Sequence, residues 1–153
     1  MAHDFHSASP LSHFDSTELL DALSTGIVVL DAHLCVIYAN VGTQDLLGFG
    51  LNQVRGRPIG DLFIDSNDLV DLLRRALTRG ETFSMHELLL TPIAAIHGTR
   101  PPVVVDATVT RLEGQITGMH LLLELADAKL RRKRTRESEL LSRVDGRRLM
   151  ARQ

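Results

Sequence analysis

The sequence predicts an α+β fold in which a five-stranded antiparallel sheet is flanked by short helices and followed by a C-terminal helix. Two strand-like runs stand close together in the first third of the chain, at residues 27–30 and 34–38. Three more follow in the second half, at residues 82–91, 102–112 and 115–125. Helical patterns lie between the two groups, an order typical of a mixed domain rather than of an alternating parallel sheet.

Length and composition indicate one globular domain. The chain has 153 residues, of which 44% are apolar and 24% are charged. Its single cysteine, Cys35, cannot form a disulfide within the chain, which favours a reducing compartment. No apolar run reaches the roughly 18 to 20 residues that a membrane-spanning helix needs. The first residues also lack the pattern of a signal peptide, so we expect a cytoplasmic protein with no membrane association.

The charges divide the chain into parts of opposite sign. Residues 1–125 hold 7 basic and 15 acidic side chains, whereas residues 126–153 hold 10 basic and 4 acidic ones. Residues 1–15 mix His, Ser and Pro without a period, which indicates a flexible leader. We therefore expect a leader at residues 1–15, a folded domain at residues 16–125 and a basic helical linker at residues 126–153.

A short helix is predicted to open the domain. Ser16 or Thr17 can cap its first turn, because a side-chain hydroxyl accepts hydrogen bonds from free backbone N–H groups. Gly26 is expected to end it. Three leucines share one side of this helix: Leu19, Leu20 and Leu23.

The first hairpin joins residues 27–30 to residues 34–38 through a tight polar turn at Asp31-Ala32-His33. Residues 41–63 contain many glycines and no long period, which predicts short helical turns that cross the sheet. Several apolar side chains of this segment are expected to point inward: Leu46, Leu47, Ile59, Leu62 and Phe63.

An amphipathic helix is predicted from Ser66 to Gly80. Asp residues stand early in it and Arg residues late, as the helix dipole favours, and Gly80 suits its C-terminal end. Apolar residues recur at helical spacing along it: Leu69, Val70, Leu72, Leu73, Ala76 and Leu77. The last two of the three following strands are expected to join through a turn at Glu113-Gly114.

An ordered series of short motifs resembles the PAS family over residues 16–125. The series runs from G-I-V-V-L-D at residues 26–31 through I-Y-A-N at residues 37–40 to G-x-P-I-x-D-L-F at residues 56–63. The resemblance implies five antiparallel strands that wrap short helices. It also implies that Asp31, Tyr38 and Asn40 form the family signature, in which the Asn closes the second strand and opens the helical segment.

Within this family, the opening L-L-D-A-L-S-T-G-I-V-V-L-D resembles the N-terminal sensors of nitrogen-regulation histidine kinases. The resemblance implies a homodimer that signals to the partner proteins of a two-component system and so regulates transcription. The basic tail resembles the linker that leads to the phosphoacceptor helix of such kinases. The kinase motifs themselves do not occur in these residues, so this chain is expected not to be an enzyme by itself. A stand-alone adaptor that binds a ligand or a protein is the alternative.

No cofactor or metal site is expected. A flavin sensor of this family needs a reactive Cys after the second strand, but Cys35 lies inside that strand and is interpreted as a core residue. A haem sensor needs an axial His on the long helix, and residues 66–79 contain none. The acidic residues from Asp61 to Asp71 lack the register of an EF-hand. The histidines of the second half are interpreted as surface or hydrogen-bonded residues: His86, His97 and His120.

The basic tail predicts a linker helix rather than a nucleic-acid site. Residues 129–136 hold six basic side chains in eight, but no aromatic side chain accompanies them. We expect the tail and the first helix to pack between two copies of the domain. The apolar positions that would carry this contact are Leu19, Leu20, Leu23, Leu130, Leu140 and Val144, although charged residues interrupt the seam. An enzyme on the same scaffold and a DNA-binding adaptor are the remaining alternatives.

Overall fold

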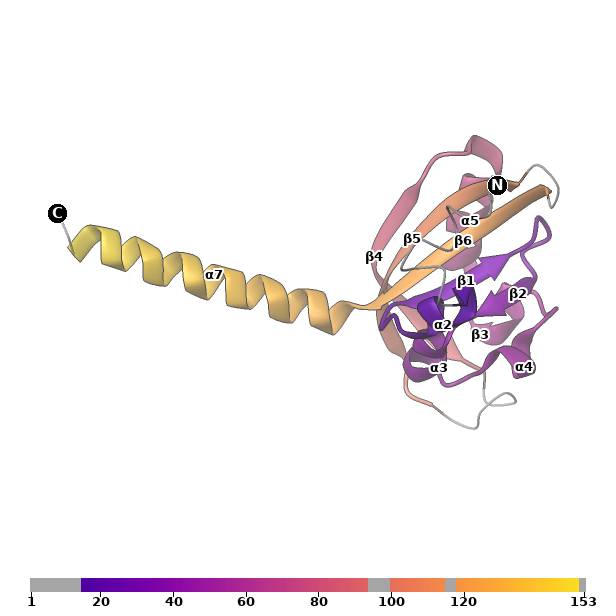
Figure 1. Cartoon of the computed structure of the whole chain (residues 1–153), viewed down its shortest axis with the longest axis horizontal. Coiled ribbons are helices and arrows are strands. Elements are labelled where there is room, and N and C mark those ends of the chain that lie inside the picture. Colours follow the sequence, from indigo (N-terminus) through magenta and orange to yellow (C-terminus); the bar gives the residue numbers. More distant parts are fainter. Residues whose placement is uncertain (1–14, 94–99, 115–117, 152–153) are drawn as a thin grey trace, which may run out of the picture.

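The computed structural model describes residues 15–93, 100–114 and 118–151 (Figure 1). The predicted leader, apart from Asp15, lies outside them. The helices are α2 (Ser16–Asp21), α3 (Val41–Leu47), α4 (Leu51–Val54), the 3-10 helix η2 (Ile59–Leu62), α5 (Asn67–Arg79) and α7 (Ala128–Ala151). The strands are β1 (Gly26–Leu30), β2 (Val36–Ala39), β3 (Phe63–Ile64), β4 (Phe83–Pro92), β5 (Val103–Gly114) and β6 (Gly118–Asp127).

The sheet confirms the predicted α+β fold but has six strands rather than five. Its strand order is β2-β1-β6-β5-β4-β3, and all of its pairings are antiparallel. The additional strand is β3, whose Phe63 and Ile64 pair with Pro92 and Thr91. A strand of two residues is too short to show an alternating pattern in the sequence.

The first helix differs from its prediction at both ends. Asp15, not Ser16 or Thr17, is the N-cap, and its carboxylate accepts a hydrogen bond from the Thr17 N–H at 3.4 Å. The helix ends at Asp21. Gly26 does not end it, because this glycine is the first residue of β1 and pairs with Leu125 of β6.

The predicted hairpin of β1 and β2 is present, with β2 beginning at Val36. Asp31 Oδ1 accepts the N–H groups of His33 at 2.9 Å and Cys35 at 3.0 Å, while Leu34 takes a left-handed conformation with φ of 64°. The predicted turn at Glu113-Gly114 is wrong. Both residues belong to β5, because the ladder of β5 and β6 extends to the Gly114–Gly118 pair.

Apolar side chains fill the space between the sheet, α5 and the short helices. Leu47, Ile59, Leu62 and Phe63 are buried as predicted, whereas Leu46 is half-buried. The α5 helix follows its predicted pattern and ends at Gly80, whose φ of 72° suits glycine. The largest side chains with almost no exposure are Phe49, Leu30, Leu47, Ile59, Leu62, Leu69, Leu72, Leu73, Leu90, Leu121, Leu123 and Leu125.

The C-terminal helix α7 extends away from the sheet as a long straight element (Figure 1). It begins at Ala128, two residues after the predicted start, because Ala126 and Asp127 still pair with Asp106 and Val105 of β5. In the part of the chain that the structure describes, no helix is long and apolar enough to cross a membrane.

Candidate functional site

Asn40 is the central residue of a buried hydrogen-bond network. Its side chain is 2% exposed, and it caps the N-terminus of α3. The Asn40 Oδ1 atom accepts the Ile27 N–H at 2.7 Å and the Thr43 N–H at 3.0 Å. The Asn40 Nδ2 atom donates to the Leu20 carbonyl at 2.8 Å and the Thr25 carbonyl at 3.0 Å. One side chain therefore joins α2, the segment after it, β1 and α3.

Thr43 completes this network from within α3. Its hydroxyl is fully buried and lies 2.9 Å from Asn40 Oδ1 and 3.2 Å from the Ile27 carbonyl. Among the described side chains, no buried nitrogen or oxygen lacks a hydrogen-bond partner. The network is thus fully satisfied, which makes its members costly to replace.

Tyr38, the second predicted signature residue, contacts α2. Its hydroxyl donates to Asp21 Oδ1 at 3.2 Å, and the same oxygen accepts the Val41 N–H at 3.0 Å. Asp31, the third, orders the hairpin turn about its carboxylate. The three signature residues therefore do not form one pocket: Tyr38 and Asn40 attach α2 to the sheet, and Asp31 shapes the turn.

Burial of Tyr38 raises the pKa of its phenol above 10.0, and the nearby Asp21 carboxylate adds to the shift. Because the neutral phenol is favoured in the folded state, its contribution to stability is present below pH about 10 and is lost as the pH rises through the folded pKa. Tyr38 is the only tyrosine and the chain has no tryptophan, so ultraviolet absorbance follows this group alone. We expect an ionisation midpoint above 10.0. The change Asp21→Asn should lower the midpoint, and an unchanged midpoint would contradict the part of the shift that is assigned to Asp21.

The junction between the sheet and α7 is a second cluster of polar contacts. Asp127 Oδ1 accepts the Lys129 N–H at 2.9 Å and so satisfies the first turn of α7, while Ala128 is fully buried. Arg132 of α7 contacts Glu87 of β4, with both Nε and Nη2 at 2.9 Å from Glu87 Oε1. These contacts attach the base of α7 to the sheet.

Glu87 lies at an irregularity in β4, where the pairing register with β5 shifts between Met85 and Leu88. Its φ of 57° is left-handed, and its N–H donates to Asp106 Oδ1 at 3.0 Å. His86 Nδ1 lies 3.3 Å from the same oxygen. The irregularity turns the Glu87 side chain toward Arg132, so α7 is held by β4 and, through Asp106, by β5.

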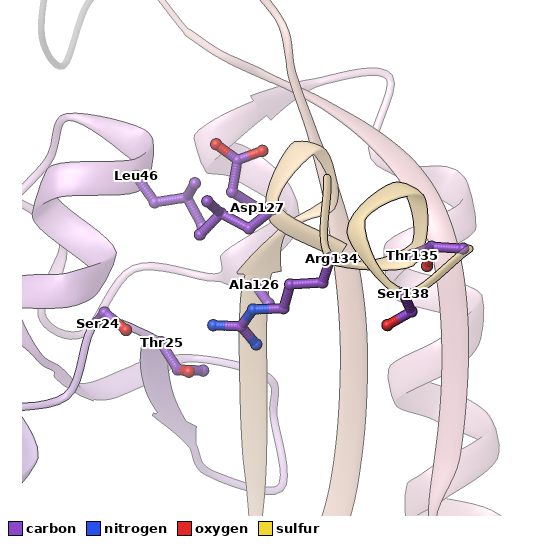
Figure 2. Close-up of a pocket in the computed structure, with 9 residues that line it drawn as sticks. Ser24, Thr25, Leu46, Ala126, Asp127, Arg134, Thr135 and Ser138 are labelled. Atoms are coloured by element: carbon purple, nitrogen blue, oxygen red, sulfur yellow. The ribbon is translucent and has the colours of Figure 1, made fainter. Parts of the chain in front are cut away.

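A hollow of about 410 Å³ opens beside this junction (Figure 2). Four parts of the chain line it: the segment between α2 and β1, the end of α3, the end of β6, and the first turns of α7. The residues that line it are Ser24, Thr25, Leu46, Ala126, Asp127, Leu130, Arg134, Thr135 and Ser138.

The predicted dimer positions lie mostly at the surface. Leu19 of α2 is 39% exposed and Leu23, two residues after α2, is 47% exposed. Leu130 and Leu140 of α7 are 51% and 59% exposed. Leu20 is half-buried, and the side chain of Val144 lies outside the described residues. The structure therefore leaves four of these leucines available to a partner.

The residues considered for cofactor or metal binding do not gather at one place. Cys35 is half-buried next to the hairpin turn. His86 is exposed and contacts Asp106, and His120 Nδ1 lies 3.3 Å from the Gly118 carbonyl, while His97 lies outside the described residues. Across residues 15–93, 100–114 and 118–151, no three His, Cys, Asp or Glu side chains are arranged to hold a metal ion.

Sequence reasoning missed the junction contacts. Arg132 and Glu87 are 45 residues apart, and no local pattern joins them. Glu87 lies within the register shift of β4, and it is from this irregular position that its side chain contacts Arg132. The one local signal of the helix cap was the acidic side chain of Asp127, which is the last residue of β6.

Comparison with known proteins identifies the fold and its relatives. A family model described as the PAS fold matches residues 16–124. The sensory histidine kinase/phosphatase NtrB of Salmonella typhimurium is 27% identical over 123 residues, which are 80% of this chain and 32% of that protein. NtrB of Escherichia coli O157:H7 is 26% identical with the same coverage. The chain spans about a third of the length of these relatives.

A solved structure agrees with these relatives. The PAS domain of nitrogen regulation protein NR(II) from Vibrio parahaemolyticus has a TM-score of 0.59 and 20% identity, over 72% of this chain and 95% of that one. At this identity the likeness shows the fold alone. Together with the NtrB matches, it confirms the resemblance predicted from the sequence.

Proposed function

Because the chain belongs to the PAS family, we propose that residues 16–125 form the sensory and dimerisation module of a cytoplasmic histidine kinase of nitrogen regulation. In this proposal, residues 126–153 form the linker that passes a signal toward a kinase dimerisation domain. The partners are a second copy of the chain and the signalling proteins of a two-component system, which in turn regulate transcription.

The observation that carries the proposal is the direct continuation of β6 into α7. Ala128 is buried and Arg132 is bound to Glu87, so a displacement of β4 or β5 changes the direction in which α7 leaves the sheet. A helix of 24 residues converts a small rotation at its base into a large displacement at its end. A signal can change the direction of α7 only if it binds the two positions of this helix with different affinity.

The exposed leucines support dimerisation through the helices. Leu19 on α2, Leu23 just after it, and Leu130 and Leu140 on α7 are large apolar side chains that are exposed to water in a single chain. Burial of a fully exposed side chain of this kind contributes about 1.5–3 kcal/mol, and these side chains, which are 39% to 59% exposed, would contribute about half of that each. Two copies that pack through α2 and α7 would remove these side chains from water.

Removal of α7 after its first residues is expected to weaken the dimer and leave the domain folded. A variant that ends at Lys129 keeps the complete β5–β6 ladder, the buried Ala128 and the Asp127 cap. Light scattering at matched concentrations should give the mass of a dimer for the full chain and a shift toward the monomer for the shortened one. An unchanged mass would overturn the role of α7.

Point changes refine this test without shortening the chain. The double change Leu130→Ser and Leu140→Ser should weaken self-association at least tenfold, because about 1.4 kcal/mol corresponds to tenfold in affinity. Ile64→Ser is the matched control, since Ile64 is 60% exposed but lies on β3, the edge strand that pairs with β4. Equal losses for the two variants would argue against a contact through α7.

A further inference from the structure

The start of α7 carries an unusual excess of positive charge. Residues 129–136 include six Lys and Arg residues and no Asp or Glu. The N-terminal end of a helix carries a partial positive charge, so cations there are unfavourable. Pairs such as Lys129–Lys133 stand four residues apart, a spacing at which like charges repel. This segment is therefore suited to receive an anion.

The basic side chains of this segment divide between two sides of the helix. Lys129, Arg132, Lys133 and Arg136 line one shallow depression of about 200 Å³, and Arg132 is bound there by Glu87. Arg134 lies on another side and lines the larger hollow at the junction. Among the described residues, Arg134 has no hydrogen-bond or ion-pair partner.

The hollow beside Arg134 combines hydroxyl groups with an apolar wall. Ser24 and Thr25 come from the segment between α2 and β1, and Thr135 and Ser138 come from α7. In Figure 2 the Arg134 guanidinium points toward the side of the hollow where Ser24 and Thr25 lie. The apolar part of the lining consists of Leu46, Ala126 and Leu130.

One carboxylate, that of Asp127, also lines the hollow, but it does not occupy the position of an anion beside Arg134. Figure 2 shows this carboxylate and the Arg134 guanidinium directed to opposite ends of the hollow. Asp127 Oδ1 is already engaged by the Lys129 N–H at 2.9 Å. The guanidinium end of the hollow is therefore lined by hydrogen-bond donors.

We infer that this hollow binds a small organic anion, a carboxylate or a phosphate ester, through Arg134. A guanidinium holds either group with two parallel hydrogen bonds, and the hydroxyls of Thr25 and Ser138 can donate further ones. The apolar wall accepts the non-polar part of the ligand. Since the hollow lies between the segment before β1, α3, β6 and α7, the bound anion joins the domain to the helix. This regulatory meaning rests on the proposed function, whereas the binding itself does not.

The test is a nuclear magnetic resonance titration of the full chain at constant ionic strength, with amide shifts of Thr25 and Ser138 as the readout. The probes are phenyl phosphate, benzoate, inorganic phosphate and benzyl alcohol. We expect saturable shifts with phenyl phosphate or benzoate, weaker ones with inorganic phosphate and none with benzyl alcohol. Comparison of phenyl phosphate with benzoate identifies the preferred anionic group.

Variants of two arginines on the same helix decide whether the binding is specific. Arg134→Gln should weaken it by about tenfold or more, because charge-assisted hydrogen bonds are lost. Arg136→Gln, which removes the same charge from the other side, should change it less than about twofold. Equal losses in the two variants, or no saturable shift, would overturn the site. Either outcome leaves the dimer measurement unaffected, so a failure here is distinguishable from a failure of the proposed function.

Discussion

Replacement of Asn40 by alanine is expected to lower the free energy of unfolding by about 3 kcal/mol, because it leaves two backbone groups without partners. The Ile27 N–H loses its acceptor and the Thr25 carbonyl loses its donor. The Thr43 N–H keeps the Asn40 backbone carbonyl at 3.1 Å, and the Leu20 carbonyl keeps the Leu23 N–H at 3.3 Å. Each unsatisfied buried group costs about 1–3 kcal/mol, and loss of the α3 cap adds to this. Urea unfolding followed by circular dichroism measures the change.

A conservative variant separates the two halves of this network. Asn40→Asp keeps the acceptor for Ile27 and Thr43 but places an oxygen against the Leu20 and Thr25 carbonyls. We expect a loss of stability for this variant as well, since the donor half joins α2 to the sheet. Asn52→Ala on α4 is the control, because Asn52 is exposed and should change stability by less than about 0.5 kcal/mol. If Asn40→Ala loses no more stability than this control, Asn40 does not attach α2 and the residues after it to the sheet.

The regular elements could be predicted from the sequence because their patterns are local. The apolar spacing of α5, the alternation of β5 and the polar turn at Asp31 each lie within a few residues of one another. The short β3 strand has no such pattern, since its existence depends on the distant partners Thr91 and Pro92.

The candidate site was predictable only in part. The motif I-Y-A-N indicated that Asn40 matters, but its partners come from α2 and β1, up to 20 residues away. The junction contacts depend on the register shift that directs Glu87 toward Arg132. Residues that come into contact only in the folded protein share no regular spacing in the sequence, so a search for periodic patterns does not identify them.

Gly42 gives a case in which sequence and structure predict opposite effects. Within the helix α3, alanine is favoured over glycine by about 1 kcal/mol, so helix propensity alone predicts that Gly42→Ala stabilises the protein. In the structure, a Cβ at this position would lie 2.5 Å from the Thr25 carbonyl oxygen and 2.9 Å from the Leu23 carbonyl oxygen. Both are backbone atoms, which cannot move aside as a flexible side chain can.

We therefore expect Gly42→Ala to lower the free energy of unfolding by about 3 kcal/mol, as overpacking of a close backbone contact does. The Thr25 carbonyl also accepts a hydrogen bond from Asn40, so its displacement weakens the network that holds α2. Asp45→Ala, at an exposed position of the same helix, is the control and should change stability by less than about 0.5 kcal/mol. Urea unfolding of both variants decides between the two effects: a gain of stability at Gly42→Ala would mean that the segment before β1 does not pack against α3 as described. A loss would establish that glycine is needed here for the close approach of two backbones, on which the positions of Leu19 in α2 and of Leu23 after it depend.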